Sequence, residues 1–116
     1  MVSDARSKGL ADRQLTIATN LMQERLREGL SLVELASSVG LSESQFARAF
    51  RLRMGVPPYR HLMGLRLDQA QRLLRASDMS IAEVATASGF SSQEHLTRVM
   101  RACLDVTPGV LRRTFR

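Results

Sequence analysis

Hydrophobic residues recur every three to four positions along most of this chain of 116 residues, which is the spacing of a single buried face on an α-helix. Between Ser31 and Gly40 the apolar positions fall at i, i+3, i+4 and i+7, at Leu32, Leu35, Ala36 and Val39. No segment alternates apolar and polar residues as a half-buried strand does. The pattern therefore predicts an all-α fold of about seven helices.

A short helix, a tight turn and a longer helix are predicted between Ser31 and Phe50. Gly40 follows the first apolar stripe, where glycine takes a left-handed backbone at little cost. Ser42 then begins the second helix, and Gln45 three residues later completes a capping-box pattern. The second helix has a buried face made of Phe46, Ala49 and Phe50. Its outer face is polar and carries Ser44, Gln45, Ala47, Arg48 and Arg51.

This layout of two helices around a glycine-containing turn, with an Arg-bearing outer face, is typical of a DNA-binding helix-turn-helix. Many helical hairpins share the layout, so the second occurrence of the motif carries more weight than the first.

The motif is repeated between Ser80 and Met100. Before the turn the two copies correspond at a constant offset: Leu32 with Ile81, Glu34 with Glu83, Ala36 with Ala85, Gly40 with Gly89, and Ser42 with Ser91. After the turn one residue is inserted, and the matches are Phe46 with Leu96, Arg48 with Arg98, Phe50 with Met100, Val56 with Val106, and Pro58 with Pro108. Four capping boxes are predicted at matching points: Ser31–Glu34, Ser42–Gln45, Ser80–Glu83 and Ser91–Glu94. Their agreement indicates a duplicated motif.

These motifs resemble the AraC/XylS family of bacterial transcription regulators. In the first copy the matching residues are Ala36, Gly40, Leu41, Ser42, Arg48, Phe50, Gly55, Val56 and Pro58. In the helix between the copies they are Arg66, Leu67, Ala70, Leu73 and Leu74. In the second copy they are Ala85, Gly89, Phe90, Ser91, Arg98, Val106 and Pro108. The resemblance covers residues 12 to 114, and motif order, spacing and connecting helix all agree.

The second copy departs from the family pattern at three positions. Leu96 and Met100 stand where an aromatic residue is usual, and these are apolar exchanges that threaten little. Asp105 replaces the usual Gly. Asp tolerates a left-handed turn less readily than Gly does, and it adds a negative charge near the DNA face that the resemblance implies. The affinity of the second site for DNA is therefore the doubtful point.

The resemblance implies sequence-specific binding of double-stranded DNA and regulation of bacterial transcription, with two recognition helices in successive major-groove segments. Candidate DNA-binding residues in the first copy are Ser44, Gln45, Ala47 and Arg48, with Arg51 directed toward the DNA backbone. In the second copy they are Gln93, Glu94, Thr97 and Arg98, with Arg101 directed toward the backbone. The family's base contacts match Ser44, Ala47, Arg48, Gln93, Thr97 and Arg98. The alternative is that some of these side chains, Glu94 above all, belong only to a solvated helix face.

The remaining segments complete a four-part organisation. Residues 1–9 are polar and small and predict a loose N-terminal tail, residues 10–56 a first lobe, residues 57–76 a linker helix, and residues 77–116 a second lobe. In the first lobe a helix is expected from Asp12 to Glu28, with a buried face of Leu15, Ala18, Met22 and Leu26. The linker helix is expected to bury Tyr59, Leu62, Met63, Leu67, Ala70, Leu73 and Leu74. At about 1.5 Å per residue this linker is roughly 27 Å long, which suits DNA segments about one helical turn apart.

Arg accounts for all but one of the 17 basic residues, and the net charge is +6. Arg binds phosphate and guanine in a forked geometry better than Lys does, although genome composition and solvated faces would also produce a high count. Arg66 is expected to pair with an acid rather than reach a phosphate. The basic end formed by Arg112, Arg113 and Arg116 fits a solvated tail or phosphate contact equally well.

The sequence contains no recognisable motif for catalysis, metal binding or cofactor binding. A single cysteine, Cys103, excludes an internal disulfide and a multi-Cys zinc site, and its apolar neighbours predict a buried, inert thiol. There is no P-loop, no G-x-G-x-x-G, no HExxH and no paired nucleophile and base, so we expect neither an enzyme nor a cofactor. No signal peptide and no apolar run of 18 residues occur, which predicts a cytoplasmic protein without a membrane partner.

Two questions about partners stay open at this point. The family consists mostly of activators that contact RNA polymerase, which makes the polymerase an implied partner. Similar proteins often carry a separate sensing or dimerising domain, so this chain is expected to act as a monomer or to dimerise through a domain that it lacks. A rival interpretation is a helical protein-interaction module whose Arg-rich face binds an acidic partner. A steep salt dependence with duplex DNA and a sequence preference would distinguish DNA binding from this alternative.

Overall fold

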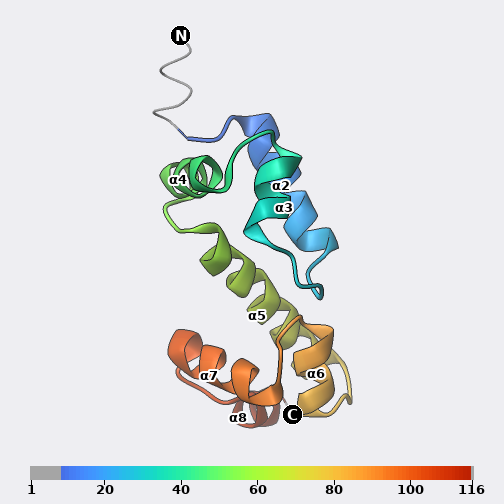
Figure 1. The fold of residues 1–116 in the computed structure, drawn as a ribbon. Helices are drawn as coiled ribbons and strands as arrows, with labels where there is room; N and C mark the ends of the chain where they lie inside the picture. The colour runs from blue at the N-terminus through green and yellow to red at the C-terminus, as the bar shows by residue number, and fades with distance from the viewer. Residues whose placement is uncertain (1–8, 116) are drawn as a thin grey trace. The chain divides into compact units, whose positions relative to one another are not determined.

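The chain folds into α-helices in a computed structural model that describes residues 9–115 (Figure 1). Over this range there are seven helices and no strand, which confirms the predicted all-α class. The helices form two compact units that divide after Met63, with one copy of the repeated motif in each. None of the helices in this range is long and apolar enough to span a membrane.

The first unit contains α2 (Asp12–Glu24), α3 (Leu32–Ser38) and α4 (Glu43–Met54). The middle helix, α3, packs against both α2 and α4. The core side chains are Ala18, Met22, Leu35, Ala36, Phe46 and Phe50. The rings of Phe46 and Phe50 lie 5.6 Å apart between centroids and are fully buried, as the sequence predicts.

The helix α2 is shorter than predicted, because it ends at Glu24 and not at Glu28. Arg25 has left the helical conformation, and its guanidinium binds Glu28 at 2.9 Å and Glu34 of α3 at 2.6 Å. Leu26 is buried, as predicted. These contacts favour a turn over a continued helix, since the chain must reverse here to lay α3 against α2.

The second unit contains α6 (Ile81–Ala87), α7 (Gln93–Leu104) and α8 (Pro108–Phe115). Here α7 packs against both α6 and α8. Fully buried side chains include Leu74, Val84, Leu96, Met100 and Pro108. Leu96 and Met100 are as inaccessible as Phe46 and Phe50 of the first unit, which confirms that they replace the phenylalanines in the core.

The long helix α5 (Pro58–Ala76) begins at the predicted proline, and the division between the units falls within it. The residues Leu62, Met63, Leu67, Ala70 and Leu74 of α5 are buried, as predicted, and Pro58 is buried as well. Leu73 is only half-buried. The prediction for Tyr59 is wrong, because its side chain is 63% exposed. Tyr59 stands in the first turn of α5, where the ring reaches solvent and its hydroxyl can bond water.

The side chain of Arg112 binds backbone carbonyl groups at the C-terminal end of α5 in the second unit. Nε of Arg112 donates to the carbonyl of Leu74 at 3.2 Å, and the same guanidinium donates to the carbonyls of Ser77 and Met79. The carbonyl of Leu74 lies in the last turn of α5, where a helix leaves its carbonyl groups without intrahelical partners, and Ser77 and Met79 lie just beyond the end of the helix. Arg112 therefore has a structural role, which differs from the solvated tail expected of it.

The structure supports the role predicted for Arg66 but not the burial predicted for Cys103. Arg66 is buried, with 8% of its surface exposed, and it interacts with other residues of the protein. Both observations support the structural role expected of it. The predicted burial of Cys103 is wrong, because the thiol is exposed on the last turn of α7. Its apolar neighbours Ala102 and Leu104 are themselves exposed, so apolar sequence neighbours did not indicate a buried position.

Candidate nucleic-acid interface

The first recognition helix, α4, is held at its N-terminus by the predicted capping box. Oγ of Ser42 accepts the Gln45 N–H at 3.2 Å, and Oε1 of Gln45 accepts the Ser42 N–H at 3.0 Å. Gly40 has a φ of 75° in the preceding turn, and the Leu41 N–H donates to the carbonyl of Ala36 at 3.0 Å. These bonds fix the angle between α3 and α4 by local chemistry alone.

The outer face of α4 carries the five predicted side chains of the first site. Ser44, Gln45, Arg48 and Arg51 are exposed, and Ala47 is half-buried. They lie opposite the buried Phe46 and Phe50. Among the described residues, Arg48 and Arg51 make no ion pair, so both guanidinium groups are available to an anionic partner.

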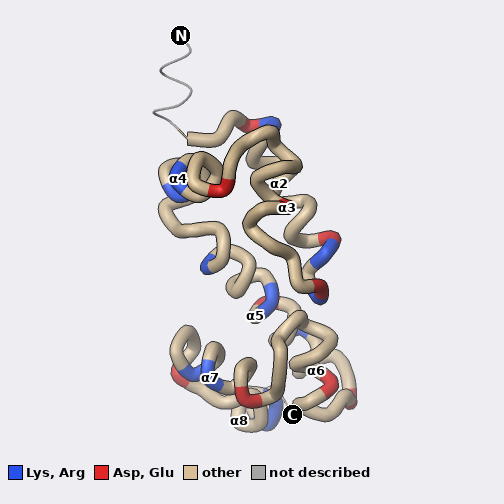
Figure 2. Tube along the Cα trace, in the orientation of Figure 1, with Lys and Arg blue, Asp and Glu red and all other residues tan. Residues whose placement is uncertain are grey.

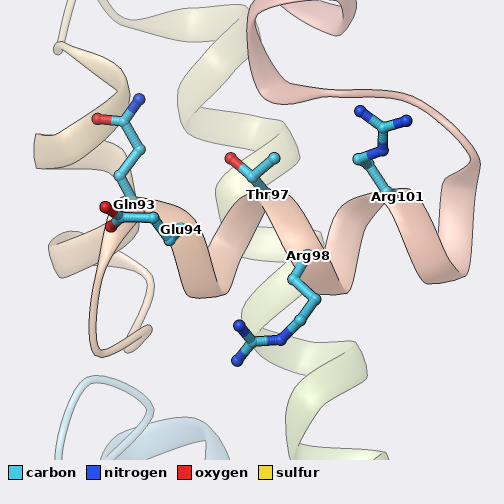
Figure 3. A pocket seen from close by; sticks show the side chains of 5 residues that line it. All are labelled: Gln93, Glu94, Thr97, Arg98 and Arg101. Atoms are coloured by element: carbon cyan, nitrogen blue, oxygen red, sulfur yellow. The ribbon is translucent and has the colours of Figure 1, made fainter.

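The five predicted side chains of the second site lie together on α7 (Figure 3). They line an open concavity of about 550 Å³, and the lining residues are Gln93, Glu94, Thr97, Arg98 and Arg101. Thr97 and Arg101 leave the helix on one side in this view, and Arg98 leaves it on the other. Four of the five are exposed, and Thr97 is half-buried. As on α4, the described residues offer no ion-pair partner to either arginine.

The N-terminus of α7 differs from the prediction. The capping boxes at Ser31–Glu34 and Ser80–Glu83 are present, but the box predicted at Ser91–Glu94 is not. Ser92 is the cap instead, and its Oγ accepts the His95 N–H at 3.0 Å. The inserted residue therefore lies inside the turn and not in the helix, because Gly89 and Phe90 keep the turn geometry of the first copy.

The register of the two recognition helices follows from this shift by one residue. The matching pairs are Ser44 with Glu94, Gln45 with His95, Ala47 with Thr97, Arg48 with Arg98, and Arg51 with Arg101. His95 is the residue of the α7 N-terminus whose structural role the sequence interpretation missed. The signal for it was the double serine at Ser91 and Ser92, which offers two possible caps.

His95 performs at α7 part of the role that Gln45 performs at α4. Its Nδ1 accepts the Ser91 N–H at 3.4 Å and lies 3.1 Å from the Ser91 hydroxyl. The imidazole meets the ring of Phe90 edge-on, with 5.3 Å between centroids. Partial burial lowers the pKa of His95, and the positive charges of Arg98 and Arg66 lower it further. The imidazole is therefore held in its neutral form, which leaves Nδ1 able to accept.

The charges on both helices are ordered along their axes. Glu43 and Glu94 lie in the first turns, and Arg51 and Arg101 lie in the last turns, which suits the helix dipole. Figure 2 shows that α4 and α7 both carry acidic residues (red) and basic residues (blue). Within residues 9–115 no three His, Cys, Asp or Glu side chains come together as metal ligands. Both outer faces therefore offer hydrogen-bonding and cationic groups for recognition.

Comparison with known proteins identifies the arrangement. A family model described as a helix-turn-helix domain matches residues 35–114. A solved transcriptional regulator from Chromobacterium violaceum, described as containing an AraC-type DNA-binding domain, is 34% identical with a TM-score of 0.82, over 89% of this chain and 92% of that one. The chain belongs to the AraC-type helix-turn-helix family.

Other members of the AraC-type family are similar over most of this chain. The DNA-binding domain of the global transcriptional factor AdpA, solved in complex with a target DNA, is 34% identical with a TM-score of 0.84, over 91% of this chain and 95% of that one. The regulator CdhR of Pseudomonas aeruginosa is 33% identical over 100 residues, which are 86% of this chain and 30% of CdhR. The regulator GbdR of the same species is 38% identical over 88 residues, which are 76% of this chain and 24% of GbdR. The chain thus spans less than a third of the length of these two regulators.

The relatives named here are described as transcriptional regulators or factors. The alternative of an acidic protein partner gains no support from them. For an AraC-type domain, the departure at Asp105 is accommodated in the backbone, since this residue adopts the left-handed conformation at the end of α7 with φ 57° and ψ 35°.

Proposed function

We propose that this domain binds duplex DNA in a sequence-specific manner and regulates transcription in a bacterium, with α4 and α7 each entering its own segment of the major groove. The observation that carries the proposal is the duplication itself. Two matched helices present Arg48 and Arg51, and Arg98 and Arg101, on exposed faces without an acidic partner among the described residues. The similarity to a DNA-binding domain solved in complex with a target DNA supports the binding of DNA by this domain.

Each candidate side chain has chemistry that suits a part of the DNA. The guanidinium groups of Arg48 and Arg98 can each donate to O6 and N7 of a guanine. Arg51 and Arg101, at the other end of each outer face, can neutralise phosphates. Gln93 can pair with adenine, and Glu94 can accept from N4 of cytosine.

The smaller side chains contribute to selectivity in a different way. Ala47 and the Thr97 methyl can contact a thymine methyl group, and Ser44 can bond either partner of a base pair. Gln45 can still donate through its amide nitrogen, although its Oε1 is engaged in the capping box. Because Ser44 and Ala47 are matched by Glu94 and Thr97, we expect an asymmetric DNA site and not a palindrome.

The experiment that tests the proposal is selection of bound sequences from random duplex DNA, followed by footprinting of the enriched duplex. Enrichment of a site with two protected segments, and binding that weakens steeply with salt, is the expected result. Failure to enrich any sequence, together with a flat salt dependence, would contradict it.

The same proposal extends to the partners and location of the domain. We propose that it binds DNA as a monomer, needs no cofactor for binding, catalyses no reaction, and works in the cytoplasm, where the bacterial chromosome lies. RNA polymerase is the proposed protein partner, since transcription is the process regulated. Light scattering with and without the enriched duplex measures the oligomeric state. Two copies of the protein on one duplex would contradict the proposed monomer.

A further inference from the structure

A segment of chain ahead of α2 is bonded directly to the first recognition helix. We call residues 9–12, which end with the first residue of α2, the N-terminal strap. The Leu10 N–H donates to the carbonyl of Ala49 in α4 at 3.3 Å. In return, Nη1 of Arg53 donates to the carbonyl of Leu10 at 2.8 Å, and Nη2 of Arg53 donates to Oδ1 of Asp12 at 2.6 Å. The Leu10 side chain is 2% exposed, so the strap is packed as well as hydrogen-bonded.

The fit between the strap and α4 leaves no room for a side chain at Gly9. This residue has a φ of 88°, which glycine alone adopts freely. A Cβ built at this position would lie 2.4 Å from the carbonyl oxygen of Ala49 and 2.9 Å from the nitrogen of Arg53. The backbones of strap and helix therefore touch. Of the tail predicted for residues 1–9, Gly9 is buried here, and residues 1–8 lie outside the described residues.

Within residues 9–115 the second motif has no equivalent of this contact. The residue that matches Arg53 in the register of α7 is Cys103, which is exposed and lacks the donors of a guanidinium group. The strap is thus a feature of the first recognition helix and does not follow from the helix-turn-helix motif, which both units share.

The guanidinium of Arg53 is also distinct from those of Arg48 and Arg51 on the same helix. Its two terminal nitrogens are directed to a backbone carbonyl and a carboxylate of the strap, whereas Arg48 and Arg51 have no such partner among the described residues. A guanidinium held in this way is oriented toward the protein and not toward a phosphate.

We propose that Arg53 is a positioning residue for DNA recognition by α4: it clamps the N-terminal strap against this helix and so fixes how Ser44, Ala47 and Arg48 meet the bases. The inference rests on the proposed function. Base readout depends on side-chain placement within fractions of an ångström, and the strap restrains α4 at Ala49 and Arg53, one to five residues beyond Arg48. The DNA segment read by α4 is then sensitive to the strap, and the segment read by α7 is not.

The test uses the duplex enriched by the unmodified protein and two derivatives in which one or the other protected segment is scrambled. Arg53→Gln removes the clamp, and Gly9→Val displaces the strap without changing any charge. Arg51→Gln serves as the phosphate-contact control, and Cys103→Ser is the matched control on α7. Affinity is measured for each duplex over a range of salt concentrations, and circular dichroism checks the folding of each variant.

We expect Arg53→Gln and Gly9→Val each to weaken binding to the full duplex by about 3- to 10-fold, with the salt slope unchanged. The loss should disappear on the duplex whose α4 segment is scrambled, and the double variant should lose no more than either single variant. Arg53→Lys, which keeps one donor, should restore part of the affinity. Cys103→Ser should leave all three duplexes unaffected.

Several outcomes would overturn the inference while leaving the proposed function intact. A salt slope reduced by about one in Arg53→Gln, as expected for Arg51→Gln, would make Arg53 a phosphate contact. Additive losses in the double variant would show that Arg53 affects DNA binding independently of the strap. Equal losses on both scrambled duplexes would show the same. Loss of helicity in both the Gln and the Lys variants would assign Arg53 to folding alone. If no duplex is enriched at all, the proposed function fails, and this inference fails with it.

Discussion

Asp105 adopts at the end of α7 the left-handed backbone conformation that Gly55 adopts at the end of α4. The φ values are 57° and 81°, and each N–H donates to a carbonyl of the last helical turn, at 3.0 Å and 2.8 Å. Asp105 is the only non-glycine residue with positive φ in the described part of the chain. The second motif therefore keeps the geometry of the first at an energetic cost.

Replacing Asp105 by glycine should stabilise the second unit by about 0.5–1 kcal/mol, because the steric cost of a Cβ in this conformation is removed. Asp105→Ala should destabilise it by a similar amount, since alanine has no side-chain oxygen to support a left-handed turn. Urea unfolding followed by circular dichroism measures both.

Asp105→Asn removes only the charge, so it should tighten DNA binding at low salt with little change in stability. Equal stability of the Gly and Ala variants would show that backbone strain is absent here.

Truncation of the core should be costly in both units. Phe50 is fully buried between Phe46 and His61, with ring centroids 5.6 Å and 5.5 Å away. Phe50→Ala should lower the free energy of unfolding by about 3–5 kcal/mol, and Met100→Ala by about 2–5 kcal/mol. Thermal unfolding is the measurement, and Tyr59→Ala is the control, because that ring is exposed. Unchanged melting of Phe50→Ala would mean that the buried face has been misassigned.

The stability of the second unit should depend on the protonation of His95. Its pKa is lowered by burial and then by Arg98 and Arg66, so the folded protein binds this proton less readily than the unfolded chain. Stability is then full above the ordinary His pKa of about 6.5 and decreases as pH falls through the lower pKa of the folded state. The melting temperature measured from pH 8 to pH 5 tests this.

The matched control for His95 comes from the first motif. His95→Gln places at this position the residue that Gln45 provides in α4, and it should flatten the pH dependence by removing the titrating group. A pH profile that is the same in His95→Gln and in the unmodified protein would exclude His95 as the source.

Much of this fold could be predicted because the chemistry is local. Three of four capping boxes, the core phenylalanines and the proline at the start of α5 depend on residues within a few positions of one another. The N-terminus of α7 was placed one residue early because Ser91 and Ser92 can each cap, and only the packing of Phe90 and His95 selects between them.

Other differences from the prediction involve contacts between residues farther apart in the sequence. The turn at Arg25 depends on Glu34, and the role of Arg112 depends on carbonyl groups more than thirty residues earlier. The bond between Arg53 and Leu10 is of the same kind. The periodicity of apolar residues does not predict such contacts, because a single long arginine side chain makes each of them. For the candidate site, the structure places the ten predicted side chains on α4 and α7 and adds the register that pairs them, and their contacts with DNA stay a prediction.

Electrostatics should account for most of the DNA affinity. If about 6–10 phosphates are neutralised, log K should fall with log salt at a slope of about −5 to −9. Arg51→Gln and Arg101→Gln should each make this slope shallower by about one and weaken all sequences alike. Fluorescence anisotropy with a labelled duplex measures the slope. A change in sequence preference without a change in slope would instead make these residues base readers.

The central claim is that α4 and α7 read different segments of one DNA site. Arg48 and Arg98 occupy equivalent positions on the two helices, and both are exposed without an ion pair among the described residues. The most direct measurement is the selection from random duplex DNA repeated with Arg48→Ala and with Arg98→Ala. Each variant should lose about 1–3 kcal/mol of binding free energy and relax the preference in one segment only, a different segment for each. If both variants relax the same base pairs, or if a single short segment gives full affinity, the two-helix account is wrong.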